Sequence, residues 1–383
     1  MKAPHAPNAF AAPTAAPGRH AGRARTGVLV ALLGALAATS AGRAHAATPG
    51  PTLPPLVTPE VVKAIDRGMT FLAKAQQADG QLPAAGNMGS YPAVMTSLAG
   101  LAFLAGGSTP EEGPYSANAK KAMLYILRVA DLGKKDGLIA GPGSESRSMY
   151  GHGFSMLFLA QCYGMELNTT FETRIREALD RGIALTAKSQ SQAGGWIYTP
   201  SGGGDEGSVT VTQLQALRAC RNVGIKVPKE VVDNAVNYLR ICQNADGGIS
   251  YSAQSRGSSR PAISAAAIAC FYAAGVYDQQ TGGSGDEAKM VDRLVAYVTR
   301  TAAADAGGGE GHDVYTQFYM AQAMYQRGGR DWEIYYPQIV ERLLKMQAPD
   351  GSWQGDGVGT TYGTAIACII LQLPYGYLPI CQR

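Results

Sequence analysis

The chain has 383 residues, of which 46% are hydrophobic, only 16% are charged and 48 are glycine, and its formal net charge is +4. This much apolar sequence can bury a large core, which excludes a wholly disordered chain, and the sparse charge argues against a long coiled coil. Glycine without a strict triplet repeat excludes collagen. A positive net charge would suit a nucleic-acid partner only if the basic residues belong to the folded part.

The excess of positive charge lies in the first 46 residues. Residues 1–46 hold five of the 33 Lys and Arg and none of the 29 Asp and Glu, which leaves the rest of the chain near −1. A basic stretch (19–25), an apolar run of 11 residues (28–38) and Ala-His-Ala at 44–46 form the pattern of a secretory signal peptide. The alternative, an uncleaved anchor, would need a longer apolar run. We expect export, periplasmic or secreted, after cleavage near Ala46, with no membrane span afterwards and no nucleic-acid partner.

A repeated motif follows a Pro-rich linker at residues 47–58. The motif is Gln, three residues, Gly, one residue and a large apolar side chain, and two degenerate copies lie near residues 136–138 and 307–309. Six units then divide residues 59–376 into repeats of about 53 residues. A period of this length indicates one supersecondary element per repeat. The four clear copies are Gln76 with Gly80 and Leu82, Gln190 with Gly194 and Trp196, Gln243 with Gly247 and Ile249, and Gln347 with Gly351 and Trp353.

Each repeat is predicted to be a pair of helices. The helix before the Gln is amphipathic, as in residues 332–346, and the helix after it is apolar nearly all round, as in residues 263–270. The last apolar helix (364–371) has no polar face, although an open solenoid would need a polar capping repeat there. We therefore predict an all-α fold, a closed six-fold α/α toroid (α6/α6 barrel) of twelve helices over residues 59–376, with a C-terminal tail at 377–383.

The Gln-x3-Gly-x-Trp copies resemble the repeats of the terpenoid cyclase and protein prenyltransferase superfamily, in particular squalene-cyclase-like, exported bacterial prenyltransferase and squalene oxidase repeat proteins. The resemblance covers residues 59–376. It implies a toroid whose central cavity binds an apolar, isoprenoid-like ligand, and a structural role for the motif residues.

The catalytic signatures of that superfamily are incomplete in this chain. The stretch nearest to the Asp-x-Asp-Asp acid of class II cyclases is 206–210, which keeps one acid, Glu206, and Thr316 stands where a prenyltransferase has a zinc-binding His. The resemblance therefore leaves open whether the protein is an enzyme. If it is one, a terpene cyclase or isomerase, or a polysaccharide lyase, is implied.

Candidate catalytic residues gather where the inner helices begin. In an α/α toroid these N-terminal ends share one mouth and favour anions. Only two His follow the signal peptide, and both fall at such ends, so a general base is the hypothesis for them. A divalent metal held by both imidazoles and a carboxylate is a weaker hypothesis, and no other cofactor is expected. The candidates are His152, His312, Asp313, Asp205 and Glu206, with helix-start or solvated-loop roles as the alternative.

Tyrosine is unusually frequent, with 19 Tyr against 8 Phe. Tyrosines at inner-helix starts would form an aromatic pocket with polar tips, which suits sugars as well as apolar ligands. Glycan binding or degradation is therefore one alternative function, and a non-catalytic repeat scaffold is another; we expect a monomer. The candidate ligand-binding residues are Tyr91, Tyr150, Tyr315, Tyr362, Arg256 and Arg260, although the arginines suit a surface role equally well.

The six cysteines leave two possibilities open. An exported protein can form disulfides, and Cys220 with Cys242 is the sequence-near pair to test, while Cys381 in the tail could pair or stay free. Most of the cysteines lie in predicted inner helices, however, where Cys packs as a small apolar residue. Buried thiols are the alternative.

Overall fold

The computed structural model describes residues 53–84, 86–141, 143–304 and 312–382, and the side chains of 302–304 are not described. The predicted signal peptide, most of the linker and the degenerate motif copy at 307–309 lie outside these residues. Within them, the regular structure consists of twelve α-helices and two short 3-10 helices, with three isolated β-bridges and no strand. None of the helices described is both long and apolar enough to span a membrane.

Two kinds of helix alternate along the chain. The odd-numbered helices each bury one face; in α1, for example, Val61, Ile65 and Leu72 point inward. They are α1 (Pro59–Ala75), α3 (Ser116–Leu132), α5 (Thr169–Lys188), α7 (Lys229–Ile241), α9 (Gly285–Ala304) and α11 (Gly329–Met346).

The even-numbered helices are buried on nearly every face, and all 14 residues of α2 are buried. They are α2 (Pro92–Ala105), α4 (Ser148–Cys162), α6 (Gly207–Asn222), α8 (Pro261–Ala274), α10 (Asp313–Arg327) and α12 (Thr360–Gln372). A helix without a polar face has to be surrounded by protein, so these six form the inner layer.

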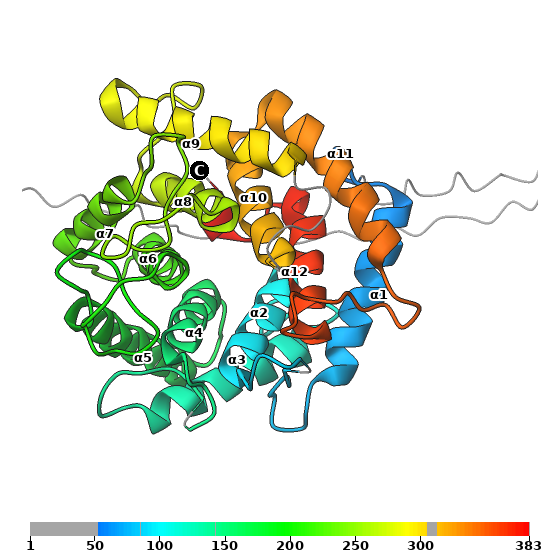
Figure 1. Ribbon diagram of the computed structural model, residues 1–383. Helices are drawn as coiled ribbons and strands as arrows, with labels where there is room; N and C mark the ends of the chain where they lie inside the picture. The colour runs from blue at the N-terminus through cyan, green and yellow to red at the C-terminus, as the bar shows by residue number, and fades with distance from the viewer. Residues whose placement is uncertain (1–52, 85, 142, 305–311, 383) are drawn as a thin grey trace, which may run out of the picture. The chain divides into compact units, whose positions relative to one another are not determined.

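The inner helices form a closed ring (Figure 1). Each packs against the next even-numbered helix, and α12 packs against α2, while the odd-numbered helices lie outside them. This confirms the predicted six-fold α/α toroid of twelve helices. The ring closes because the last inner helix is as apolar as the others and can be buried only against the first.

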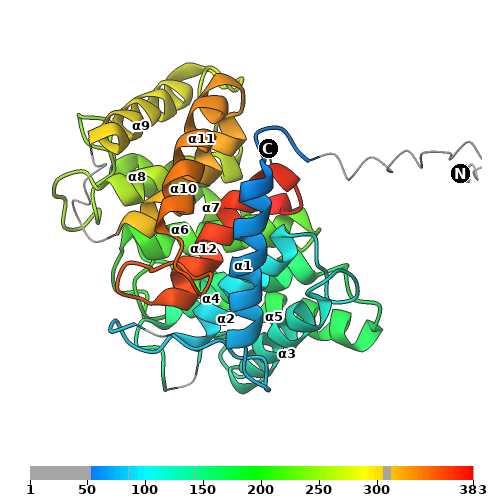
Figure 2. The same cartoon turned by 90° about the vertical axis from the view of Figure 1, so that its right-hand side faces the viewer.

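The motif Gln residues join neighbouring repeats. The Gln190 side-chain amide donates to Gly194 O at 2.9 Å within its own turn and to Val231 O at 2.9 Å on the next outer helix. Gln347 makes the equivalent second bond to Ala64 O of α1 at 2.9 Å, so the same contact links the last repeat to the first. Figure 2 shows α1 beside α12 at this closure.

The other two clear motif copies make the same pair of contacts. The Gln76 amide donates to Gly80 O at 3.1 Å in its own turn and to a carbonyl of α3 at 3.1 Å. The Gln243 amide donates to Gly247 O at 3.0 Å and to a carbonyl of α9 at 3.0 Å. In these copies too, one side chain therefore holds its turn closed and attaches it to the following outer helix.

The motif tryptophans attach each turn to the outer helix that precedes it. The buried Trp353 indole donates to Leu343 O of α11 at 2.8 Å, and the Trp196 indole donates to Thr186 O of α5 at 2.7 Å. The Trp353 ring also lies against α1, where a Cβ atom at Gly68 would be only 2.7 Å from it. Copies with Leu or Ile at this position fill the apolar site but have no indole N–H to donate.

The residues predicted to be a C-terminal tail are part of the core. Leu378, Ile380 and Cys381 are buried, and the second 3-10 helix (Pro379–Cys381) packs against α6 and α10. The Gln326 amide, near the end of α10, donates to Ile380 O at 3.3 Å. These residues therefore cover the end of the ring at which the inner helices finish. Figure 2 shows the C-terminus there, near the start of α1.

All six cysteines are buried free thiols. Burial raises the pKa of Cys220 to about 12, and Cys242 forms no disulfide with it. The cysteines therefore act as small apolar core residues in this structure.

Candidate functional site at the mouth of the barrel

The loops that lead into the inner helices bond to one another around one end of the ring. Met149 N donates to Tyr198 O, Gly207 N donates to Tyr251 O, and Asn87 N donates to Gly357 O, each pair joining two repeats. We call this end the mouth. It comprises residues 86–93, 143–150, 196–208, 249–261, 312–315 and 354–362.

Glu206 is the most buried acid of the mouth, with 1% of the residue exposed. It precedes α6 in extended conformation, and its carboxylate accepts the Val209 N–H at 2.8 Å and the Ser208 hydroxyl at 2.7 Å. These donors favour the charged form, but burial outweighs them and raises the pKa of Glu206. The carboxyl group therefore keeps its proton to a higher pH than an exposed Glu and can donate it.

Three tyrosines from three repeats surround this carboxyl group. The Tyr150 hydroxyl bonds to Ser208 Oγ, the same group that donates to Glu206. The Tyr150 and Tyr198 rings lie 6.1 Å apart, and the Tyr198 hydroxyl bonds to that of Tyr251. These hydroxyls are bonded to protein groups, and of the three residues Tyr251 is the most exposed, while Tyr150 and Tyr198 are half-buried.

Two further tyrosines reach the same place from the other side of the ring. Burial, followed by the charges of Tyr319, Tyr150 and Glu206, raises the pKa of Tyr315 well above its usual range. Coulombic effects of this kind act over several ångströms, so Tyr315 lies in the neighbourhood of Tyr150 and Glu206, while its ring contact is with Tyr319, at 4.9 Å between centroids. Tyr362 of α12, 7% exposed, also acts on Tyr315. We call Tyr150, Tyr198, Tyr251, Tyr315 and Tyr362 the tyrosine cluster.

Other carboxylates of the mouth cap inner helices of neighbouring repeats. Asp356 accepts the N–H groups of Val314 and Tyr315 at 3.0 and 2.9 Å, at the start of α10. Glu145 accepts the Ala93 N–H at 2.7 Å, at the start of α2. The first N–H groups of a helix have no partner within the helix, so these contacts satisfy them and join the repeats.

His152 is not at the mouth surface, contrary to expectation. Since α4 begins at Ser148, His152 lies one turn inside and is fully buried. Its Nδ1 accepts the Ile139 N–H at 3.1 Å, so Nε2 carries the proton and donates to Thr186 Oγ1 at 3.0 Å. Burial lowers the pKa of His152 to about 4. A neutral ring with both nitrogens bonded to protein is a core residue.

The second histidine is also without the expected partner. His312 is exposed ahead of α10, and Asp313 pairs with Arg342 of α11 at 2.6 Å. The structure does not bring His152 and His312 together. Among the residues described, no group of three or more His, Cys, Asp or Glu could hold a metal ion.

The other predicted residues are dispersed. Asp205 accepts the Ala253 N–H at 2.6 Å and joins the loops before α6 and α8. Tyr91 is half-buried before α2, and its hydroxyl lies 3.4 Å from Ser146 Oγ. Arg256 donates to Gln243 O at 2.8 Å on a motif turn, and Arg260 directly precedes α8. Of the predicted residues, Glu206, Tyr150, Tyr315 and Tyr362 come together, with Tyr91 at the edge.

Sequence reasoning missed Tyr198 and Tyr251. Both stand two residues after the large apolar residue of a motif copy, Trp196 or Ile249. Extending the repeat comparison by two positions would have found them. No sequence pattern indicates the contact between Glu145 and Ala93, because it depends on where the loop before α4 meets the start of α2.

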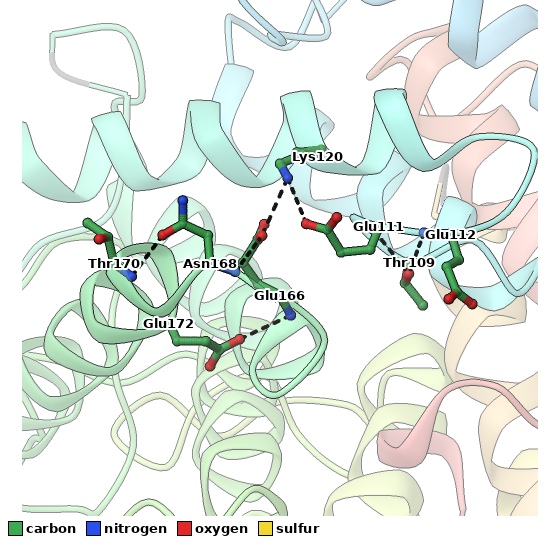
Figure 3. A network of polar contacts seen from close by, with 8 residues as sticks. All are labelled: Thr109, Glu111, Glu112, Lys120, Glu166, Asn168, Thr170 and Glu172. Atoms are coloured by element: carbon green, nitrogen blue, oxygen red, sulfur yellow. Dashed lines mark hydrogen bonds and ion pairs between the residues drawn. The ribbon is translucent and has the colours of Figure 1, made fainter.

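A second polar cluster lies at the opposite end of the ring (Figure 3). Lys120 Nζ lies 2.7 Å from Glu111 and 3.4 Å from Glu166, and the Glu172 carboxylate accepts the Glu166 N–H at 3.2 Å. The contacts join the loops after α2 and α4. They hold the two loops together at this end.

A surface groove of about 740 Å³ lies between α7 and α9 on the outer layer, lined among others by Arg240, Glu287 and Arg293. Its charged groups are paired with protein groups: Arg240 with Glu287 at 2.6 Å, and Arg293 with Gln243 Oε1 at 3.0 Å. The groove is therefore a weaker candidate site than the mouth.

The sequence matches no protein-family model and no curated protein. Solved structures share the fold. The type II terpene cyclase MstE from Scytonema matches with a TM-score of 0.52 at 14% identity, over 83% of this chain and 99% of its own. The chain therefore has the α/α-toroid fold that this cyclase also has.

Carbohydrate-active proteins share this toroid as well. An unsaturated glucuronyl hydrolase specific for heparin matches with a TM-score of 0.56 at 10% identity, over 83% of this chain and 97% of its own. The GH76 α-mannanase of Bacteroides thetaiotaomicron gives 0.56 at 9% identity, with coverages of 83% and 96%. At such identities the likeness concerns the fold, and function has to be argued from the site.

Proposed function

We propose that the protein binds an isoprenoid-like small molecule over the tyrosine cluster and that Glu206 donates a proton to it. The observation that carries the proposal is the convergence of aromatic side chains from several repeats on one buried, protonatable carboxyl group. MstE, whose fold the chain shares, has been solved in complex with geranylgeranyl dihydroxybenzoate as its substrate, which supports an apolar ligand.

The acid strength of Glu206 limits which group of the ligand can accept its proton. Because burial raises its pKa, Glu206 is a weak acid, and an isolated alkene is a poor base. An oxygen atom accepts a proton far more readily, so we expect the proton to go to an ether, alcohol or epoxide oxygen. After the transfer, the Ser208 hydroxyl and the Val209 N–H stabilise the carboxylate.

The test is acid-promoted cyclisation of a C20 isoprenyl epoxide, followed by mass spectrometry. Glu206 protonates the epoxide oxygen, the C–O bond breaks, an alkene carbon bonds to the cationic carbon, and a proton leaves to water, which gives an isomer of equal mass. We expect the purified protein to form the isomer and Glu206→Gln to slow it by about 100-fold or more. Glu112→Gln, an exposed control outside the mouth, should keep the rate. Equal rates with and without Glu206 would contradict the proposal.

A glycan ligand is the second candidate, supported by the 40% exposure of Tyr251, whose ring could stack on a sugar. Three of the matching structures are named as enzymes that act on carbohydrates, an α-amylase, a glucuronyl hydrolase and an α-mannanase. Calorimetric titration with heparin disaccharides and manno-oligosaccharides separates the two candidates. Binding that is lost in Tyr251→Ala would favour a glycan, and no binding would remove it. If neither ligand class binds, the non-catalytic scaffold gains support.

We also propose that the protein is exported and monomeric. The pattern in residues 1–46 supports export. N-terminal sequencing of the protein recovered outside the cytoplasm should begin just after Ala46, and light scattering should give the mass of one chain.

A further inference from the structure

The C-terminal segment, residues 377–382, occupies the end of the ring opposite the mouth. Leu378, Ile380 and Cys381 are 5%, 6% and 2% exposed, whereas Tyr377 is 56% exposed. The segment contains no charged residue. It therefore turns one apolar face toward the ends of the inner helices, where its 3-10 helix packs against α6 and α10.

Two glutamines hold the main chain of Ile380 from opposite sides of the ring. Gln161 Oε1 accepts the Ile380 N–H at 3.4 Å, and Gln326 Nε2 donates to Ile380 O at 3.3 Å. Gln161 lies in the last turn of α4 and Gln326 in the last turn of α10, and these two helices are three places apart in the ring of six. The contacts bind a peptide group and do not depend on the side chain of Ile380.

Each of these glutamines uses only half of its amide. Gln161 and Gln326 are 2% and 4% exposed, yet Gln161 Nε2 and Gln326 Oε1 have no hydrogen-bond partner among the residues that the structure describes. Leaving a buried amide group unpaired is costly, and native proteins usually pair such groups. The two side chains therefore form a site for a peptide main chain that the resident segment fills only in part.

This site is separate from the mouth. Gln215 Nε2 of α6 donates to Gln322 Oε1 of α10 at 2.9 Å, and both residues are buried. Because α8 stands between α6 and α10 in the ring, this bond spans the ring interior. Gln322 lies one helical turn before Gln326. The bond therefore lies between the C-terminal segment and the tyrosine cluster.

The segment is attached in a way that allows it to leave. It follows Gly376, which is exposed and has φ of 72°, a conformation in which glycine is unstrained. Its bonds to Gln161 and Gln326 are at the long end of the normal range. Burial of three side chains is opposed by the entropy lost in ordering the segment. Such a terminal unit can open while the rest of a fold stays intact.

We propose that the recess at this end of the ring is a peptide-binding site, which recognises the main chain around one aliphatic residue, and that the C-terminal segment is its removable occupant. A free peptide with the same apolar pattern would take the place of the segment. The ligand is thus of another class than the one proposed for the mouth, and it binds at the other end of the ring.

Thiol labelling of the full-length wild-type protein in native buffer measures release of the segment. Cys381 is 2% exposed, and burial raises its pKa to about 12, so its thiol reacts only when the segment leaves the recess. Mass spectrometry should show Cys381 reacting about 100-fold faster than Cys270 of α8, which is reached only when the ring unfolds. Equal rates would overturn the proposal, because the segment would then leave only on global unfolding.

A charge at the buried position should release the segment. We expect Ile380→Asp to speed the labelling of Cys381 about tenfold or more, because a carboxylate is poorly accommodated between α4 and α10. Gln382→Asp is the matched control, since it adds the same charge at an exposed position of the same segment, and it should keep the wild-type rate. If Cys270 reacted as fast as Cys381 in Ile380→Asp, the ring would not survive without the segment, which would contradict a removable occupant.

Binding of a free peptide tests the site itself. The probe is a fluorescein-labelled peptide of residues 374–383 with Cys381→Ser, followed by fluorescence anisotropy. It should bind Ile380→Asp protein about tenfold or more tightly than wild type, because the apparent affinity follows the fraction of open sites. Adding Gln326→Glu, which removes the donor to the peptide carbonyl, should weaken this binding about tenfold.

The control is the same peptide with Ile380→Asp, which should bind neither protein. Absence of binding of the original peptide to Ile380→Asp protein would overturn the proposal, and so would equal binding of the two peptides. None of these measurements involves the mouth or its ligand, so their outcomes are independent of the function proposed above.

Discussion

Glu145 shows how a single buried residue couples this protein to pH. Its Oε1 accepts the Ala93 N–H, and its Oε2 lies against Gly151, where a Cβ atom would be only 1.9 Å away. The residue is 6% exposed, and burial raises its pKa to about 7. Gly151 therefore provides the space for a carboxyl group that is neutral in the folded protein over much of the acidic range.

We expect Glu145 to make the protein less stable as pH rises. The folded carboxyl group holds its proton up to about pH 7, whereas the unfolded one loses it near 4.5, so its contribution is complete below 4.5 and is lost as pH passes 7. Relative to Glu145→Gln, the wild-type free energy of unfolding should fall by about 3 kcal/mol between pH 4.5 and 8.

Urea unfolding at a series of pH values measures this difference. Glu177→Gln, which removes an exposed carboxylate of α5, should follow the wild-type curve. Parallel curves for wild type and Glu145→Gln would show that the carboxyl group is not protonated in the fold.

At the scale of residues, the sequence indicates helix starts but not side-chain directions. Glu206 and three of the cluster tyrosines were predictable because they precede or begin inner helices. His152 was placed wrongly, because a shift of one helical turn moves a side chain from the mouth to the interface with α5.

At the scale of elements, each motif turn makes the same contact with the next outer helix. Gly351 has φ of 91°, and a Cβ atom there would lie 2.6 Å from Arg67 O of α1. The degenerate copy keeps this feature: Gly137 has φ of 83°, and its Cβ would lie 2.5 Å from Arg181 O. A carbonyl of the next outer helix therefore occupies the space of a side chain in both turns.

Gly351→Ala should therefore destabilise the protein more than its backbone conformation alone requires. Left-handed φ costs alanine about 1 kcal/mol, and the collision with Arg67 O adds to it, for a total of about 3 kcal/mol. Gly164→Ala is the control, with φ of 85° and no atom within 4 Å of the added Cβ. Urea unfolding of Gly164→Ala should show a free energy of unfolding lower than that of the wild type by about 1 kcal/mol. Equal losses of stability in Gly351→Ala and Gly164→Ala would mean that the close contact between the turn and α1 adds no cost.

The helices themselves were predictable and the C-terminal residues were not. Amphipathic and fully apolar periods alternate along the chain, and each corresponds to an observed outer or inner helix. Residues 377–383 are too short to show a period, so only the structure shows that Ile380 and Cys381 are buried against α6 and α10.

At the scale of the whole molecule, ring closure determines where chemistry is possible. Closing six repeats brings the starts of α4, α6, α10 and α12 to one mouth, although these segments lie up to about 210 residues apart in sequence. The sequence predicts this gathering because every inner helix follows an outer one in the same order. It cannot predict which side chains meet, since that depends on loop contacts between repeats.

The central claim, that the mouth is the ligand site, is tested most directly by hydrogen–deuterium exchange with and without geranylgeraniol, a C20 isoprenoid alcohol. The account predicts slower exchange in residues 147–152, 196–209 and 249–253 and at the start of α10, and unchanged exchange along the groove between α7 and α9. Protection of residues 286–293 in that groove, with the mouth unaffected, would contradict it.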